Sequence, residues 1–187
     1  MIRLFVGISL PIEVKEALNK LYFKSDCIKW VAPENLLLTL YYIGEVQEEK
    51  GIRIHQLLQE LEHDPFAMVF RGVGCFSQKG VVRSVYANIE ASKELLALQE
   101  KIVKKFKPEK TQEKRLNFRP HVTLGRADKC QLSSIENFLH VHRNFLLSPF
   151  NVNNFTLFSV QKAEGGVQYQ TEAYYTLKKK SLLNRLL

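Results

Sequence analysis

Two similar tetrapeptides, LLTL at residues 37–40 and HVTL at residues 121–124, decide the fold of this 187-residue chain. The first begins 35 residues after Ile2 and the second begins 39 residues after Val82, and a strand is predicted to start near each of those two residues. A helical pattern lies between the strand start and the tetrapeptide in both cases. The sequence therefore predicts a duplicated strand-helix-strand unit with pseudo-twofold symmetry.

Further strands and helices surround the two units. Apolar residues recur at helical spacing in four segments: after Pro11, over residues 47–62, from the expected N-cap Ser92 to Phe106, and over residues 133–141. Besides the first strand, extended segments are predicted at residues 28–43, 66–76, 81–89 and 121–124, and a hairpin pairs residues 155–160 with 167–177 across residues 164–166. These patterns predict an α+β fold. We expect a single bilobal domain over residues 1–187, with mainly antiparallel sheets lining a central cleft and helices outside.

The composition limits the class of protein. Apolar residues make up 45% of the chain and charged residues 25%, which is typical of globular proteins and excludes a mainly disordered chain. Three cysteines, Cys27, Cys75 and Cys130, are few and odd in number and never spaced C-x-x-C, so a disulfide scaffold is not expected. Reduced thiols in a cytoplasm are the simplest interpretation. No apolar stretch approaches the roughly 18 residues of a membrane span, so no membrane association is expected.

Positive charge is concentrated ahead of the second tetrapeptide. The chain has 27 Lys and Arg against 19 Asp and Glu, a net charge of +8. Nine basic residues and two acidic ones lie between residues 101 and 126; the basic ones are Lys101, Lys104, Lys105, Lys107, Lys110, Lys114, Arg115, Arg119 and Arg126. Such a run suits a polyanionic ligand such as RNA or a nucleotide phosphate, although ordinary solvation of a charged surface is the alternative. A second cluster, Lys178–Lys180, is consistent with a solvated tail.

Residues two apart in a strand point to the same side, so His121 and Thr123 share one face. An imidazole transfers protons near neutral pH and a hydroxyl donates a hydrogen bond to phosphate, which makes this pair a candidate phosphate site. Arg126 lies five residues from His121, the wrong parity for the same face, and reaches the site only if the strand ends at Gly125. There it would hold phosphate in a bidentate manner. The alternative is a core histidine beside a surface arginine.

The segment FRPHVTLGR at residues 118–126 resembles the second H-x-T-x motif of the 2H phosphoesterases. More specifically, the chain resembles the RNA 2′,3′-cyclic phosphodiesterases, also called the 2′-5′ RNA ligase family. RLFVGI at residues 3–8, WVAPENL at residues 30–36 and FTLFS at residues 155–159 match the same family in order. The resemblance covers essentially the whole chain.

The chain departs from the family at one position. The family has a histidine after Asn35-Leu36, where this chain has Leu37, and Thr39 is kept. The resemblance implies that the first histidine donates a proton and the second accepts one, so His121 is the expected base and the donor is missing. Losing one such participant typically costs about 10²–10⁴ in rate. Leu37 is either a natural loss or an introduced change.

The resemblance also suggests which residues contact the substrate. Thr39, Thr123 and Arg126 are expected to hold the phosphate, and Phe5 and Ser159 lie in segments that contribute to the family's cleft. Tyr41 shares the predicted strand face of Leu37 and Thr39 and is expected either to stack on a base or to pack in the core. No metal site or cofactor is expected. The remaining histidines are expected to be solvated, namely His55, His63, His140 and His142.

Three hypotheses follow for function. The first is a cytoplasmic, monomeric phosphodiesterase that hydrolyses the 2′,3′-cyclic phosphate of RNA ends or nucleotides to a 2′-phosphate. The second is a catalytically impaired module that binds RNA ends or nucleotides through the same cleft. The third is a scaffold or partner-binding protein that has kept only the fold.

Overall fold

The computed structural model describes residues 1–106, 118–163 and 166–178. Several expectations lie outside these residues: Lys107, Lys110, Lys114 and Arg115 of the basic run, Lys179 and Lys180 of the tail, and residues 164–165 of the hairpin turn. The described elements are, in chain order, β1 (Ile2–Ser9), α1 (Ile12–Asn19), β2 (Ile28–Trp30), the 3₁₀ turn η1 (Pro33–Asn35), β3 (Leu37–Val46), α2 (Glu48–Gln59), β4 (Phe66–Met68), β5 (Phe70–Gln78), β6 (Val81–Ile89), α3 (Lys93–Phe106), β7 (His121–Gln131), the 3₁₀ turn η2 (Leu132–Ser134), α4 (Glu136–Val141), β8 (Phe150–Val152), β9 (Asn154–Ala163) and β10 (Gly166–Thr176).

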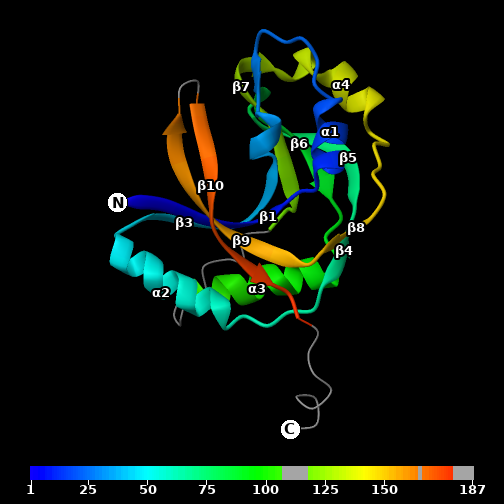
Figure 1. Cartoon of the computed structure of the whole chain (residues 1–187). Helices are drawn as coiled ribbons and strands as arrows, with labels where there is room; N and C mark the ends of the chain where they lie inside the picture. Colours follow the sequence, from blue (N-terminus) through cyan, green and yellow to red (C-terminus); the bar gives the residue numbers. More distant parts are fainter. Residues whose placement is uncertain (107–117, 164–165, 179–187) are drawn as a thin grey trace.

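Two four-stranded antiparallel sheets form the two lobes. We call them sheet A, with the strand order β10-β9-β1-β3, and sheet B, with the order β2-β7-β6-β5. Helices α2 and α3 contact each other, and α3 also contacts β3 of sheet A (Figure 1). The prediction of an α+β fold with mainly antiparallel sheets and helices outside is confirmed.

The predicted duplication extends to the hydrogen-bond register. In sheet A, Leu38 pairs with Ile8 and Thr39 with Gly7 on β1, and the next pair, Tyr41 with Val6, leaves Leu40 without a paired residue on β1. In sheet B, Thr123 pairs with Tyr86 on β6 and Gly125 pairs with Val85, which leaves Leu124 without a paired residue on β6. Each tetrapeptide therefore ends in a β-bulge at its final leucine, and a bulge reverses which face the following residues occupy.

One hydrophobic core joins the two lobes. Buried residues of sheet A such as Val6 and Leu38 belong to the same cluster as Val85 and Val122 of sheet B. The helices contribute the positions that their spacing predicts, for example Leu18 and Ile102, which are both fully buried. Ser92 caps α3 as expected, since its Oγ accepts a hydrogen bond from the Leu95 amide at 3.2 Å.

Two extended segments are interrupted where the sequence predicts continuous strand. Residues 28–43 contain the η1 turn, in which the Leu36 amide donates to the carbonyl of Pro33. Residues 66–76 divide between β4, which pairs with β8, and β5, which pairs with β6. The sequence does not show the second break. Apolar residues recur at every second position, at Phe66, Met68 and Phe70, as they would in one continuous strand, and all three are buried.

The expectation of three reduced thiols is wrong. Cys27 and Cys130 form a disulfide with their Cα atoms 5.2 Å apart, and Cys75 is free. The two residues are 103 positions apart, and only the pairing of β2 with β7 brings them together. The hydrogen bond from the Asp128 amide to the Cys27 carbonyl, at 3.0 Å, extends that pairing toward the disulfide.

Within the described ranges, no helix is both long enough and apolar enough to cross a membrane.

Candidate active site

The two tetrapeptides line one cavity of about 560 Å³. Sheet A contributes Leu37 and Thr39 from β3, and sheet B contributes His121, Thr123 and Arg126 from β7. The structure therefore brings together five of the eight residues that the sequence singles out. A volume in this range is ordinary for a small-molecule or nucleotide site.

The bulge at Leu124 explains how Arg126 reaches the cavity. The strand does not end at Gly125, as the sequence analysis required, but continues to Gln131. Because Leu124 is the extra residue, Leu124 and Gly125 are both buried and Arg126 emerges on the side of His121 and Thr123. Arg126 lines the cavity as predicted, but it does so because of the bulge and not because the strand ends.

The equivalent bulge at Leu40 has the opposite consequence for Tyr41. The predicted common face of Leu37, Thr39 and Tyr41 is wrong, because the bulge turns Tyr41 to the other side of the sheet. There its ring stacks on Phe106 of α3, with centroids 5.1 Å apart and an interplanar angle of 6°. Tyr41 packs against the main core and does not line the cavity.

His121 is held in one orientation by its surroundings. Its Nδ1 lies 2.7 Å from the carbonyl oxygen of Arg119, and its ring contacts Phe76 edge-on and Tyr86 at a tilt. A carbonyl oxygen only accepts hydrogen bonds, so the neutral imidazole carries its proton on Nδ1. Nε2 therefore has an available lone pair, and His121 has the tautomer of a proton acceptor. Burial raises the pKa of the neighbouring Tyr86, which favours its neutral form.

Leu37, the position at which the sequence resemblance leads us to expect a histidine, has apolar surroundings. It packs with Phe5 and Phe158, and Val160 and Tyr169 lie against the same group, which we call the apolar floor. Only 9% of the Leu37 surface is exposed. An alkyl side chain neither transfers a proton nor donates a hydrogen bond, so this side of the cavity has no acid–base group at residue 37.

Two predicted substrate contacts lie away from the cavity surface. Phe5 is 3% exposed and stacks on Phe158 beneath Leu37, so it supports the cavity without lining it. Ser159 pairs with Leu4 of β1, and directly paired residues share a face of the sheet. Leu4 belongs to the main core, so Ser159 lies on the face opposite Phe5.

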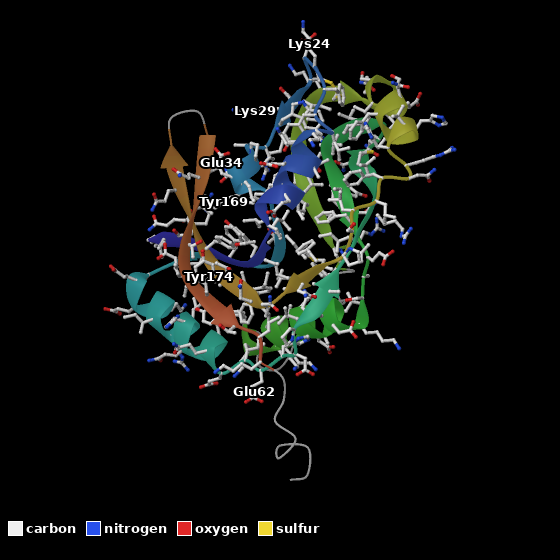
Figure 2. The ribbon with its side chains drawn as sticks, turned by 45° about the vertical axis from the view of Figure 1, so that its right-hand side comes forward. Lys24, Lys29, Glu34, Glu62, Tyr169 and Tyr174 are labelled. Carbon is white, nitrogen blue, oxygen red and sulfur yellow. A yellow bond between two sulfur atoms is a disulfide. The ribbon has the colours of Figure 1, made fainter. Side chains whose placement is uncertain are left out.

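The sequence analysis missed the residues of the remaining wall. Lys29 and Trp30 of β2, Asn35 of η1, and Gln168 and Tyr169 of β10 all line the cavity. Figure 2 shows Lys29 and Tyr169 on segments far apart in the sequence. Residues 30–36 resemble the family, which was the one available signal, but no role followed from it. Lys29 pairs with Arg126 across β2 and β7, which adds a second cation to the cavity.

Most of the described part of the basic run is not at the cavity. Lys101 donates to the carbonyl of Glu62, Lys104 pairs with Glu100 and Lys105 pairs with Glu60. Of the described members of the run, Arg126 lines the cavity. None of the other four histidines lines it, and His63, expected to be solvated, is 6% exposed and bonded through Nδ1 to the Asp64 carbonyl.

Comparison with known proteins identifies the family. The sequence pattern of the 2′-5′ RNA ligase superfamily matches residues 11–164, well over half of the chain. The chain belongs to the 2′-5′ RNA ligase superfamily.

Two curated relatives that resemble the chain carry the same name. The RNA 2′,3′-cyclic phosphodiesterase of Archaeoglobus fulgidus is 37% identical over 131 residues, which cover 68% of this chain and 73% of the relative. The RNA 2′,3′-cyclic phosphodiesterase of Aquifex aeolicus is 25% identical over 183 residues, covering 94% and 97% of the two chains. The predicted resemblance is confirmed.

Two solved structures have the same fold. TT0787 of Thermus thermophilus superposes with a TM-score of 0.75 at 26% identity, covering 96% of this chain and all of that one. E. coli LigT complexed with 3′-AMP superposes with a TM-score of 0.73 at 24% identity, covering 95% and 99% of the two chains. The fold of this superfamily member is therefore that of crystallised proteins.

Proposed function

We propose that this chain is an RNA 2′,3′-cyclic phosphodiesterase, which opens the cyclic phosphate of RNA ends or nucleotides to a 2′-phosphate. One observation carries the proposal: the available Nε2 of His121 shares a cavity with the hydroxyls of Thr39 and Thr123 and the guanidinium of Arg126. The reaction named for the curated relatives supports the same activity.

Ring opening needs two proton transfers on opposite sides of phosphorus. A water molecule attacks phosphorus while the P–O3′ bond breaks, and Nε2 of His121 accepts the proton that the water loses. The departing O3′ must gain a proton, and Leu37 has none to give, so solvent water supplies it. His121 then returns its proton to solvent, and the net change is the addition of one water across the P–O3′ bond.

The phosphate-holding groups act on the charge that this attack creates. The hydroxyls of Thr39 and Thr123 donate hydrogen bonds to phosphoryl oxygens from the two sheets, and Arg126 offers a bidentate, charge-assisted contact. In this scheme the phosphate contacts are made by side chains, and the protons move between the substrate, His121 and solvent water. The expectation of no metal and no cofactor stays a prediction.

The apolar surroundings of Leu37 favour a second candidate function. Its burial against Phe5 and Phe158 makes one side of the cavity apolar, which disfavours the water that would protonate O3′. The second candidate is therefore a catalytically impaired module that binds RNA ends or nucleotides through the same groups. The two candidates differ in turnover and not in binding.

The test is hydrolysis of an RNA oligomer that ends in a 2′,3′-cyclic phosphate, with the position of the product phosphate determined by ³¹P NMR. We expect slow formation of the 2′-phosphate, loss of this activity in His121→Ala, and retention in the control His140→Ala, which removes a histidine of α4 away from the cavity. A 3′-phosphate product, or turnover that survives His121→Ala, contradicts the proposal. Binding of the oligomer without turnover in the unmodified chain selects the second candidate.

We further propose that residues 1–187 act as one monomeric domain in the cytoplasm. The core that joins the two sheets supports one domain. Because Cys27 and Cys130 form a disulfide, reduced thiols no longer argue for a cytoplasmic location. The proposed RNA substrate is the argument that favours the cytoplasm. Sedimentation velocity tests the monomer, and a mass of twice the chain would contradict it.

A further inference from the structure

The chemistry proposed above uses only part of the cavity. Proton transfer and phosphate contacts involve β3 and β7, whereas the wall formed by η1 and β10 has no part in either. That wall carries an aromatic side chain, Tyr169, and a polar side chain, Asn35, within the same 560 Å³ space. A nucleotide has a base as well as a phosphate, so the base is a candidate ligand for this wall.

The ring of Tyr169 is fixed from behind. It meets the ring of Phe5 edge-on, with centroids 4.9 Å apart and an interplanar angle of 73°. Phe5 in turn stacks on Phe158 at 5.0 Å and 16°, so Tyr169 rests on the apolar floor that also holds Leu37. Tyr169 is half-buried and lines the cavity, so part of its surface faces the ligand space. A ring fixed in this way loses little conformational entropy when another ring packs on it.

Asn35 holds the strand that carries Tyr169. Its Nδ2 donates to the Val167 carbonyl at 2.8 Å, and its Oδ1 accepts from the Tyr169 amide at 3.3 Å. β10 is an edge strand of sheet A, so the Asn35 amide pairs with that edge as a neighbouring strand would. Asn35 lies two residues before Leu37 in sequence, which ties the backbone of Tyr169 to the first tetrapeptide.

We propose that Tyr169 is the platform on which the base of the terminal nucleotide stacks, and that Asn35 is the positioning residue for this platform. The inference rests on the proposed function, because it assigns the base of that substrate. Stacking on an aromatic side chain tolerates every base, since each has a π-face, and it strengthens with the area of the base. The cavity therefore takes ends of any sequence and prefers purine-terminated ones.

The test measures binding and does not depend on turnover. Isothermal titration calorimetry gives the Kd of adenosine 2′-monophosphate, cytidine 2′-monophosphate and inorganic phosphate for the wild type and each variant. Tyr169→Leu removes the ring, Tyr169→Phe keeps it, and Tyr174→Leu is the matched control. Tyr174 is also on β10, is 64% exposed and does not line this cavity (Figure 2).

We expect Tyr169→Leu to weaken the binding of adenosine 2′-monophosphate by roughly 5- to 150-fold, while the Kd of phosphate changes by less than about twofold. Tyr169→Phe and Tyr174→Leu should bind both ligands as the wild type does, and the wild type should prefer the adenine nucleotide over the cytosine one. Asn35→Ala should also lower the ratio of nucleotide affinity to phosphate affinity. A uniform loss of stability would not change this ratio.

Two results overturn the inference: no preference of the wild type for the adenine nucleotide over phosphate, or a ratio of nucleotide to phosphate affinity that is unchanged in Tyr169→Leu, whether both ligands bind as before or both are weakened equally. Failure of the proposed function looks different. It would leave the base-dependent affinity intact and appear as an absence of cyclic-phosphate hydrolysis.

Discussion

Leu37 occupies in β3 the position that His121 occupies in β7, and both side chains line the same cavity. Each residue begins its strand, each precedes a threonine by two positions, and each tetrapeptide ends in a bulged leucine. The two tetrapeptides therefore place residues 37 and 121 at matching backbone positions of the two sheets. One of these positions carries an imidazole and the other an apolar side chain.

The first prediction concerns the two threonines. Thr39→Val and Thr123→Val remove a hydroxyl at nearly constant shape, so each should weaken binding of adenosine 2′-monophosphate by roughly 10- to 100-fold, the range for a hydrogen bond to a charged group. Equal losses are expected because the two positions are related by the pseudo-twofold axis. Calorimetry provides the measurement, and Thr176→Val, which changes an exposed residue of β10, is the control. A loss in only one variant would mean that one sheet alone holds the phosphate.

The second prediction concerns the close approach of β2 to β7. A Cβ atom at Gly125 would lie 2.6 Å from Ile28 Cγ2 and 3.0 Å from Trp30 Cε3, so Gly125→Ala must displace the strand that forms one cavity wall. We expect a loss of about 1–3 kcal/mol in the free energy of unfolding, measured in urea. Gly51→Ala is the matched control. Its Cβ atom would lie within helix α2, 4.0 Å from Leu4, so a gain of roughly 0.5–1 kcal/mol is expected. Equal effects of the two substitutions would contradict this account.

The third prediction concerns alkaline pH. Burial raises the pKa of Tyr22 to about 12 from an ordinary value of 10, and its hydroxyl donates to the Val31 carbonyl at 2.8 Å. The folded state holds this proton more tightly than the unfolded state does, so the stabilisation is complete below pH 10 and is lost between pH 10 and 12. Tyr22→Phe should therefore make the free energy of unfolding, measured in urea at each pH, less steeply dependent on pH in that window. Identical slopes in wild type and Tyr22→Phe would rule out the burial of this hydroxyl.

The fourth prediction concerns the disulfide. Thiol labelling of the unfolded, unreduced protein should modify one cysteine, Cys75, and labelling after reduction should modify all three. The bond closes a loop of about 100 residues, so its reduction should lower the free energy of unfolding by about 2–5 kcal/mol. Three reactive thiols before reduction would show that Cys27 and Cys130 do not form a disulfide.

The sequence predicts the duplicated units, the α+β class and the residues of the two tetrapeptides, because periodicity and local pairs are readable without tertiary contacts. It does not predict the bulges at Leu40 and Leu124, which depend on the register between strands. For that reason the sequence places Tyr41 on the wrong face, and Arg126 reaches the cavity by a route that the sequence does not show. The Cys27–Cys130 pair and the Asn35–Tyr169 contact join segments more than 100 residues apart, and no local pattern marks either of them.

The central claim is that this chain has a proton acceptor at His121 and lacks a donor at residue 37. The most direct test compares hydrolysis of a 2′,3′-cyclic phosphate RNA end by the wild type and by Leu37→His under identical conditions. We expect Leu37→His to be faster by roughly 10²–10⁴, the usual contribution of one general acid, and the gain to disappear when His121→Ala is added. A Leu37→His variant that folds and binds the RNA end but hydrolyses it no faster than the wild type would contradict the claim.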